Sequence, residues 1–346
     1  MAEFYDISTW NEKPWFQTGG TRDKVILENP NTQEIYYFKT SLKKETIDYK
    51  YEFWSEIIAS EVGTLLGFNL LRYDIAFNRG YIGCISKSMV TEGTNKLAEG
   101  ISYLTGFDTT YNPEDKEAKK PYTFHFIRDT LDYFHLGRFI DNIVEIIVFD
   151  SIIGNGDRHQ ENWGIITNYT EVIKTIKDLA KKADKGFKEK LLFTIMAITN
   201  KTRRKEIDNL MKDLHIIMPG MFSEIYDSGS CLGRELSADK VMQMLTDQIM
   251  IEGYIRKGVS EIHWKGVKLN HFDLIEKVKE EHPEKVFELI DMVRNRFNEN
   301  KLKDTIFSVD SKLPKEFEVY KLPEDRKKFI NKLITLRVGK LIQIKP

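Results

Sequence analysis

The sequence has few of the residues that build cross-links or metal cages, and no long apolar run. Its two cysteines, Cys84 and Cys231, lie in separate regions without a Cys-x-x-Cys pair, so neither a disulfide framework nor a zinc site is expected. No segment approaches the roughly 18 consecutive apolar residues of a membrane-spanning helix. The first residues, MAEFYDISTW, are acidic and aromatic, unlike a signal or transit peptide. These absences predict a cytoplasmic protein without a membrane span.

An excess of charge of one sign is also missing. The 346 residues include 52 basic and 53 acidic side chains, for a net charge of −1, so no direct nucleic-acid partner is expected. The apolar content of 41% and the aromatic content of 12% are typical of a folded globular protein. A chain of this length can bury a large core and form two lobes.

Two short apolar runs near the amino terminus, 25–27 and 35–38, predict a pair of strands. Before the first of them stand Gly19, Gly20 and Thr21. Glycine has no Cβ, so such a pair lets backbone N–H groups approach phosphate oxygens closely. A Gly-Gly pair is also compatible with a plain hairpin turn, and these residues alone leave both interpretations open.

The second apolar strand ends at Lys39, and an amphipathic helix is predicted for residues 49–66, with Gly67 as its end. A lysine at the end of a strand can reach nucleotide phosphates or simply face water. Glu56 lies close to the apolar stripe of the helix. From there it can pair with Lys39 and orient it, or face solvent.

Strand character returns over residues 71–86, where two alternating runs flank a turn and predict a hairpin. The chain then becomes polar and, further on, mostly helical, so we place a boundary between two lobes near residues 88–95. Residues 95–122 are polar and irregular. We expect them to form an exposed loop with some helix.

A strongly apolar helix predicted over residues 136–152 delivers the chain to a stretch, 154–164, that is rich in Gly, Asn and Asp. Within it Asp157 and Asn162 stand five residues apart. A rigid loop could make them a base and a magnesium-ligating oxygen that face one substrate, as in the catalytic loop of protein kinases. The alternative is a polar turn that caps the helix. Arg158 is expected to pair with a carboxylate, and His159 to pack within the loop.

Asp227 follows a short apolar approach and precedes a serine and a glycine. A lone Asp-x-Gly is common in turns, but this one follows the loop of Asp157 by a short strand and a predicted helical insert near 168–215. In kinases the second metal-binding aspartate stands in that relation. The order of glycine loop, strand lysine, helix glutamate, hairpin, catalytic loop and Asp-x-Gly is the one expected of a two-lobed ATP phosphotransferase.

Two of these motifs resemble a known family. Gly156–Gly164 (GDRHQENWG) and Tyr226–Glu235 (YDSGSCLGRE) resemble the HipA-like serine/threonine kinases, and Ile262–Phe272 looks like part of that family's carboxy-terminal helical domain. The Gly-Asp-Arg-His…Asn motif is also similar to the corresponding motif of phosphatidylinositol 3- and 4-kinases. The resemblance covers residues 15–300 and is strongest at the two acidic motifs.

The resemblance implies an α+β, two-lobed protein-kinase-like fold, with a small strand-rich N-lobe over residues 1–92 and a larger helical C-lobe over residues 93–346. It also implies ATP and Mg²⁺ as cofactors. The roles that it implies are catalysis by Asp157; metal binding by Asn162 and Asp227; phosphate contact by Lys39, with Glu56 as its partner; a phosphate-covering loop at Gly19, Gly20 and Thr21; and an adenine-binding hinge at residues 86–90, which include Lys87 and Met89.

The implied reaction transfers phosphate to a serine or threonine of a protein substrate, and the family adds an antitoxin or another regulatory partner to the expectations. A lipid or small-molecule kinase is the alternative among enzymes. A non-catalytic nucleotide-binding module of a toxin–antitoxin pair is the alternative from another class. The insert is longer than the family's usual connection, and a serine follows Asp227 where eukaryotic kinases have phenylalanine. Thr18 and Thr21 are candidate sites of regulatory phosphorylation.

Overall fold

The computed structural model describes residues 1–13, 24–44, 47–114, 122–168 and 220–345, with single residues at 171, 174, 177 and 186. Gly19, Gly20 and Thr21 of the expected phosphate-covering loop, the candidate site Thr18 and nearly all of the insert lie outside the described residues. What was expected of them stays a prediction.

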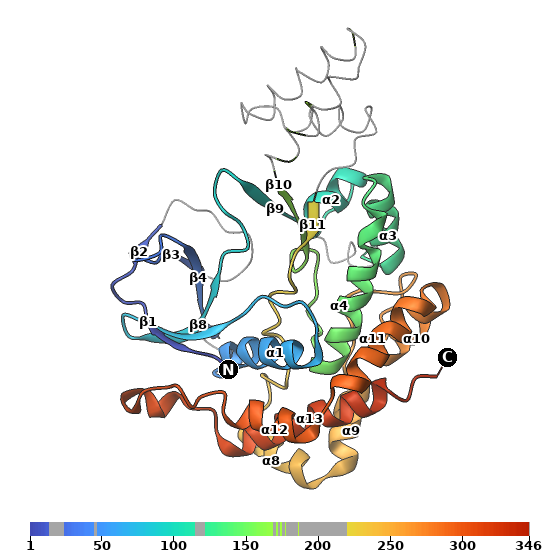
Figure 1. Cartoon of the computed structure of the whole chain (residues 1–346). Helices are drawn as coiled ribbons and strands as arrows, with labels where there is room; N and C mark the ends of the chain where they lie inside the picture. Colours follow the sequence, from blue (N-terminus) through green and yellow to red (C-terminus); the bar gives the residue numbers. More distant parts are fainter. Residues whose placement is uncertain are drawn as a thin grey trace.

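A curled six-stranded sheet, on the left of Figure 1, forms most of the amino-terminal part. Its strand order is β1-β7-β8-β4-β3-β2, and its neighbours are antiparallel except for the parallel β1–β7 pair. The strands and the hairpin predicted from the sequence are confirmed. The strands span Phe4–Asp6 (β1), Asn11–Glu12 (β2), Lys24–Glu28 (β3), Ile35–Thr40 (β4), Asp74–Asn78 (β7) and Tyr81–Lys87 (β8), and a two-stranded ribbon joins Lys43–Lys44 (β5) to Ile47–Asp48 (β6).

The two faces of this sheet have different chemistry because successive side chains of a strand point in opposite directions. Leu27, Phe38 and Ile85 point to one face, where they pack with Ile7 in a small apolar cluster. Lys39 follows Phe38 in the strand and therefore points to the opposite face. That second face is the one covered by helix α1.

Helix α1 (Glu52–Leu66) is buried on almost every side. It lies between the sheet and two carboxy-terminal helices, α11 (Pro283–Arg296) and α12 (Glu299–Phe307). It ends at Gly67, whose φ of 94° is in the left-handed region that glycine adopts without a steric penalty. The helix predicted for 49–66 is confirmed, with its start at Glu52. The packing holds Glu56 inside the protein, at 2% exposure.

A second sheet, β11-β10-β9, contains a strand that was not expected. Asn95–Glu99 forms β9 and pairs with β10 (Gly164–Asn168), which also pairs with β11 (Gly220–Phe222). The prediction of an exposed loop at the start of 95–122 is therefore wrong for β9. Its polar sequence carries little strand signal, and the pairing with β10, the strand after the Asp157 loop, stabilises it.

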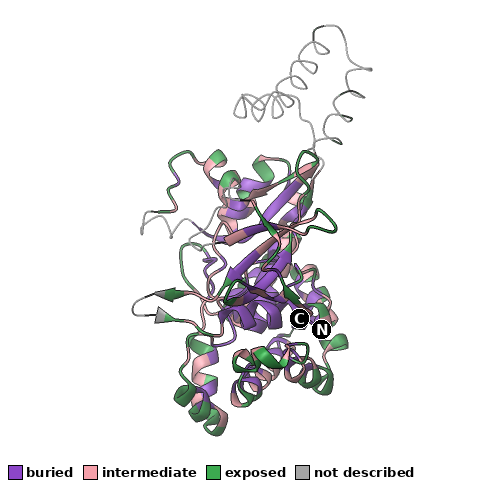
Figure 2. Ribbon diagram, turned by 90° about the vertical axis from the view of Figure 1, so that its left-hand side faces the viewer, coloured by how far each residue is buried: buried purple, intermediate pink, exposed green. Residues whose placement is uncertain are grey.

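Helices make up most of the remaining chain, on the right and at the bottom of Figure 1. Figure 2 shows the buried residues running through the centre of the molecule. Within the described ranges, no helix is long and apolar enough to cross a membrane. Besides α11 and α12, the helices are α2 (Gly100–Phe107), α3 (Phe124–Tyr133), η2 (Gly137–Phe139), α4 (Ile140–Ile153), α8 (Ala238–Thr246), α9 (Gln248–Lys257), α10 (His271–Glu281), η3 (Lys315–Tyr320) and α13 (Glu324–Leu341).

Asp247 and Gly339 stand at or near the ends of carboxy-terminal helices. Helices α8 and α9 are separated at Asp247, whose side chain accepts a hydrogen bond from the N–H of Met250 (3.0 Å) and caps α9. Helix α13 continues through Gly339, a residue type that commonly ends helices, to Leu341. Leu341 is fully buried, so its packing outweighs the helix-ending preference of glycine.

The carboxy-terminal segment also contacts the six-stranded sheet. The ring of Phe317 in η3 packs against Phe4 of β1 and Phe77 of β7, with centroids 5.2 and 4.7 Å away. The indole N–H of Trp54 in α1 donates to the backbone carbonyl of Tyr320 (3.0 Å). These contacts join the two halves of the chain behind α1 and fix the position of that helix.

The buried His271, the first residue of α10, predicts a loss of stability in acid. Burial, with Arg337 and Lys268 nearby, lowers the pKa of His271 well below its usual value. The unfolded chain therefore binds a proton more readily, so the stability is present above about pH 6.5 and is lost as the pH falls. We expect His271→Gln to reduce the fall in urea-unfolding free energy between pH 7 and pH 5. An equal fall in wild type and variant would contradict this role.

Candidate active site

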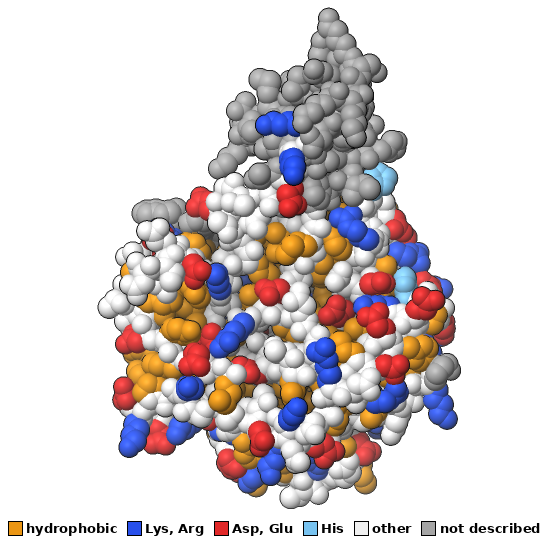
Figure 3. All heavy atoms as spheres, viewed as in Figure 1, with side chains coloured by type: hydrophobic (Ala, Val, Ile, Leu, Met, Phe, Trp, Pro, Cys, Tyr) orange, Lys and Arg blue, Asp and Glu red, His pale blue; other side chains and the backbone are white. Residues whose placement is uncertain are grey.

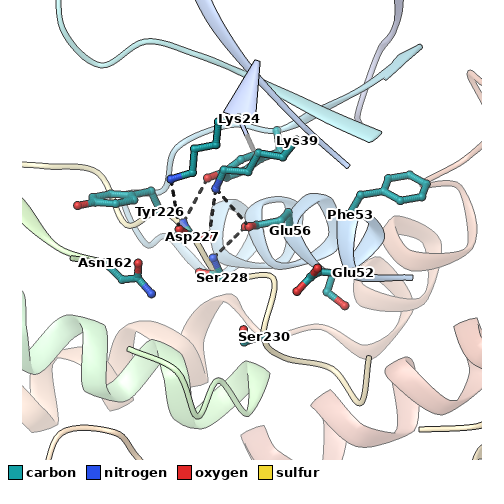
Figure 4. A network of polar contacts seen from close by, with 12 residues as sticks. Lys24, Lys39, Glu52, Phe53, Glu56, Asn162, Tyr226, Asp227, Ser228 and Ser230 are labelled. Carbon is teal, nitrogen blue, oxygen red and sulfur yellow. Dashed lines mark hydrogen bonds and ion pairs between the residues drawn. The ribbon is translucent and has the colours of Figure 1, made fainter. Parts of the chain in front are cut away.

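Side chains from three distant segments meet beneath the six-stranded sheet (Figure 4). The ammonium of Lys39, from β4, lies 3.1 Å from Oδ1 of Asp227 and 3.6 Å from Oε1 of Glu56 on α1. Lys39 and Glu56 are buried, and the side chain of Asp227 is 17% exposed. The structure thus brings together the strand lysine, the helix glutamate and the Asp-x-Gly aspartate that the sequence singled out.

Glu56 also holds the segment after Asp227. Its Oε2 accepts a hydrogen bond from the backbone N–H of Ser228 (2.8 Å). A Cβ on the next residue, Gly229, would lie 2.9 Å from Oε1 of Glu56 and 3.1 Å from its Cγ and Cδ. The glycine of the Asp-x-Gly motif is therefore needed for the close approach of α1.

Replacing Gly229 with alanine is expected to push the Glu56 carboxylate away from Lys39. Weakening one charge-assisted contact should lower the nucleotide affinity about 10-fold or more, as measured by calorimetric titration with a non-hydrolysable ATP analogue. Gly253→Ala in α9 is the matched control, because a Cβ there meets no described residue within 4 Å apart from its own helix backbone. Equal affinities for the two variants would show that the glycine contact has no such role.

Asp227 has an uncommon backbone conformation for a residue with a side chain. Its φ is 55°, in the left-handed region, which aspartate tolerates better than most residues. Its N–H donates to the hydroxyl of Tyr73 (3.2 Å). Residues that are held in this way often cluster at functional sites, and here the conformation turns the carboxylate toward Lys39.

A second lysine, which the sequence analysis did not identify as a candidate, also faces Asp227. The ammonium of Lys24, on β3, lies 3.8 Å from Oδ2 of Asp227. Lys24 and Lys39 are direct partners in the register of β3 and β4. An alignment of the two predicted strands about their turn would have shown this pairing, but neither strand by itself points to Lys24.

The charges of the two lysines are stabilised to different degrees. Burial disfavours the charge of Lys39, but Asp227, Tyr73 and Glu56 outweigh burial, and its pKa is well above the usual value. Burial and the repulsion of Lys39 lower the pKa of Lys24, and Asp227 offsets only part of this effect. Lys39 is the firmly held cation of the site, and Lys24 is the loosely held one.

The catalytic-loop candidate begins where α4 ends. Gly154 closes the helix with a φ of 71°, and the side chain of Asn155 accepts from the N–H of Asp157 (3.2 Å). The Ser230 hydroxyl donates to Oδ2 of Asp157 (2.9 Å), and the Asn162 amide donates to the Asp157 backbone carbonyl (2.8 Å). These bonds hold Asp157 and Asn162 on one compact loop that touches the segment after Asp227.

Arg158 joins this loop to the core. Its guanidinium is fully buried and pairs with the Asp150 carboxylate on α4, at 2.8 and 3.0 Å. It also donates to the backbone carbonyls of Asn162 and Tyr226 and to the hydroxyl of Ser228. Burial raises the pKa of Asp150, and Arg158 counters this. The expected pairing of Arg158 with a carboxylate is confirmed, and the pairing links both acidic motifs.

Asn162 and Asp227 have the donor chemistry of a magnesium site. The nitrogen of the Asn162 amide is used by the Asp157 carbonyl, so its Oδ1 remains as a ligand atom. In the part of the chain that the structure describes, no three His, Cys, Asp or Glu side chains form a metal-binding group. Magnesium is commonly bound by one or two such oxygens together with substrate phosphates. The residues fit magnesium brought in with a nucleotide.

The predicted hinge, residues 86–90, begins in the last two residues of β8. The Lys87 ammonium pairs with Glu34 at 2.5 Å, and the Lys87 side chain is 57% exposed. Met89 is partly buried and packs against the main core. The N–H of Ser88 donates to the carbonyl of Ile35 (2.8 Å). The Lys87 side chain is thus directed to Glu34, and a contact of residues 86–90 with adenine stays a prediction.

Comparison with known proteins identifies similar folds. No protein-family model matches the sequence, and no curated protein matches it. Among solved structures, the proinflammatory kinase CtkA of Helicobacter pylori is similar with a TM-score of 0.67 at 16% identity, over 97% of this chain and 95% of that chain. HipA of Shewanella oneidensis MR-1, in a complex with HipB and operator DNA, has a TM-score of 0.49 at 12% identity, over 97% of this chain and 67% of that chain.

The first of these neighbours shows the fold. The expected α+β architecture is confirmed, while the boundary at residues 92 and 93 and the roles of the single site residues stay predictions. Over nearly its whole length, this chain has the mixed α+β fold of the kinase CtkA.

Proposed function

We propose that this chain is an ATP- and Mg²⁺-dependent phosphotransferase that acts on serine or threonine side chains of a protein. The observation that supports it most is the network in which Lys39 contacts both Glu56 and Asp227, at 3.6 and 3.1 Å. A lysine paired with a helix glutamate and placed beside a metal-binding aspartate is the arrangement that kinases need for activity. The fold shared with a kinase supports the same proposal.

The residues divide the work of phosphate transfer. Lys39 binds phosphate oxygens, and Glu56 keeps the ammonium in place. Asn162 and Asp227 hold magnesium, which when bound neutralises charge on the phosphates. The transition state is loose, so positioning and charge neutralisation matter more than covalent chemistry.

Asp157 orients the acceptor hydroxyl and takes its proton late in the transfer. The hydroxyl oxygen bonds to the γ-phosphorus while the bond to the bridging oxygen breaks, and ADP leaves. Ser230 donates to Oδ2 of Asp157 (2.9 Å), which leaves Oδ1 to accept the hydroxyl proton.

A protein acceptor is favoured over a lipid one by the surface. Acidic and basic side chains are interspersed on the face shown in Figure 3, and the net charge is −1. Enzymes that work on anionic membranes commonly use a basic amphipathic surface. The antitoxin or other regulatory partner stays a prediction.

The test is transfer of labelled γ-phosphate from ATP in the presence of magnesium, with protein mixtures and inositol-lipid vesicles as separate acceptors. We expect phosphoserine or phosphothreonine with the wild type, and none with Asp157→Ala or Asp227→Ala. Transfer that survives both substitutions would overturn the site. Label found only on the lipid would replace the protein acceptor by a lipid one.

A further inference from the structure

Lys24 and Lys39 form a like-charge pair across two strands. They lie directly opposite each other in the antiparallel β3–β4 register, on the face of the sheet that covers the site. Like charges at opposed positions of a sheet are destabilising. Both ammonium groups are also largely withdrawn from water, since the side chains are 17% and 9% exposed. Folding stability alone therefore disfavours a lysine at position 24.

The two lysines depend on Asp227 to different extents. Lys39 has Glu56 as a second carboxylate at 3.6 Å, in addition to Asp227 at 3.1 Å. Within the described residues, Asp227 is the one carboxylate within 4 Å of the Lys24 ammonium, at 3.8 Å. This distance is longer than a hydrogen bond. When Asp227 turns its oxygens to a metal ion, Lys39 keeps a partner and Lys24 loses its own.

The Lys24 ammonium is placed where it can bind an anion above Asp227. Figure 4 shows its side chain descending from the sheet beside Lys39, so that both ammonium groups lie over Asp227. Lys24 is also the first residue of β3, immediately after the segment that contains the expected phosphate-covering loop. A lysine binds phosphate as a compact point charge, and a nucleotide triphosphate carries the oxygens that replace the lost carboxylate.

We propose that Lys24 is a second phosphate-binding residue, which leaves Asp227 when the magnesium nucleotide binds and contacts its β- and γ-phosphates. This inference rests on the proposed function, since it requires a nucleotide in the site. The proposed function assigns phosphate binding to Lys39 on β4, and this inference adds Lys24 on β3. In this arrangement Asp227 holds both cations before the nucleotide binds and releases Lys24 afterwards.

Calorimetric titration without turnover tests the proposal, with a non-hydrolysable ATP analogue plus magnesium and with AMP as the two probes. Lys24→Met is expected to weaken the analogue about 10- to 100-fold and to leave AMP affinity nearly unchanged, while Lys24→Arg retains most of the affinity for the analogue. Lys312→Met is the matched control, because Lys312 makes an ion pair of the same length, 3.8 Å, with Glu3 away from the site. Its affinities are expected to equal those of the wild type.

The outcomes separate this proposal from the proposed function. A wild type that binds neither probe would overturn both. If the wild type and Lys24→Met bind the analogue equally well, the role of Lys24 is overturned and the proposed function is not. Equal losses for the analogue and AMP would show a structural role and overturn phosphate contact. Circular dichroism checks folding, and Lys24→Gln takes the place of Lys24→Met if that variant does not fold.

Discussion

Replacing Asp157 with asparagine is expected to lower the rate of phosphate transfer by about 10²- to 10⁴-fold, the usual contribution of a positioned base. The amide has the same shape and can still accept the hydrogen bond from Ser230, but it cannot take the acceptor proton. Lys39, Glu56 and Asp227 are unchanged in this variant. The affinity for magnesium nucleotide should therefore stay close to that of the wild type.

Single-turnover transfer from labelled ATP, with nucleotide affinity measured in parallel, checks this expectation. Asp239→Asn, at an exposed position in the first turn of α8, is the control for a change of one negative charge. It is expected to leave the rate unchanged. A rate for Asp157→Asn equal to that of Asp239→Asn would show that Asp157 is not the base.

Arg158→Met is expected to destabilise the protein by about 3–5 kcal/mol, the cost of removing one partner of a buried ion pair. The substitution leaves the buried Asp150 carboxylate without its cation and removes the donor to the carbonyls of Asn162 and Tyr226. Because these carbonyls belong to the segments that carry Asn162 and Asp227, the site should loosen before the whole chain unfolds.

Urea denaturation of the wild type and Arg158→Met measures this loss. Lys277→Met removes the cation of the exposed pair with Glu280, and an exposed pair is expected to contribute less than about 1 kcal/mol. Asp150→Leu combined with Arg158→Met should recover part of the stability, since two apolar residues leave no buried charge. A loss for Arg158→Met as small as that for Lys277→Met would contradict the central position of Arg158.

Much of the site follows from the order of the motifs along the chain. Glu56 was a candidate because it lies close to the apolar stripe of α1, and Lys39 because it lies near the end of the apolar strand β4. The structure places Lys39 between Glu56 and Asp227. The carboxylate partner expected for Arg158 is Asp150, eight positions earlier.

What the sequence did not reveal depends on contacts between distant segments. Lys24 became a candidate only through the β3–β4 register and its distance to Asp227. Strand β9 exists because β10, more than sixty residues later, pairs with it. The hydrogen bond from Ser230 to Asp157 joins two residues that stand on either side of the long insert in the sequence. No local pattern of apolar residues carries information of these kinds.

We propose that Asn162 and Asp227 hold magnesium against a nucleotide that the lysines bind, and the magnesium dependence of nucleotide binding tests this claim. A non-hydrolysable ATP analogue is titrated into the wild type, Asp227→Asn and Asn162→Ala, with magnesium and with EDTA. We predict that magnesium strengthens binding to the wild type by about 10-fold or more, the effect of at least one charge-assisted contact, and that both variants lose this gain. Binding that is equally strong with and without magnesium, or a gain that persists in Asp227→Asn, would contradict the claim.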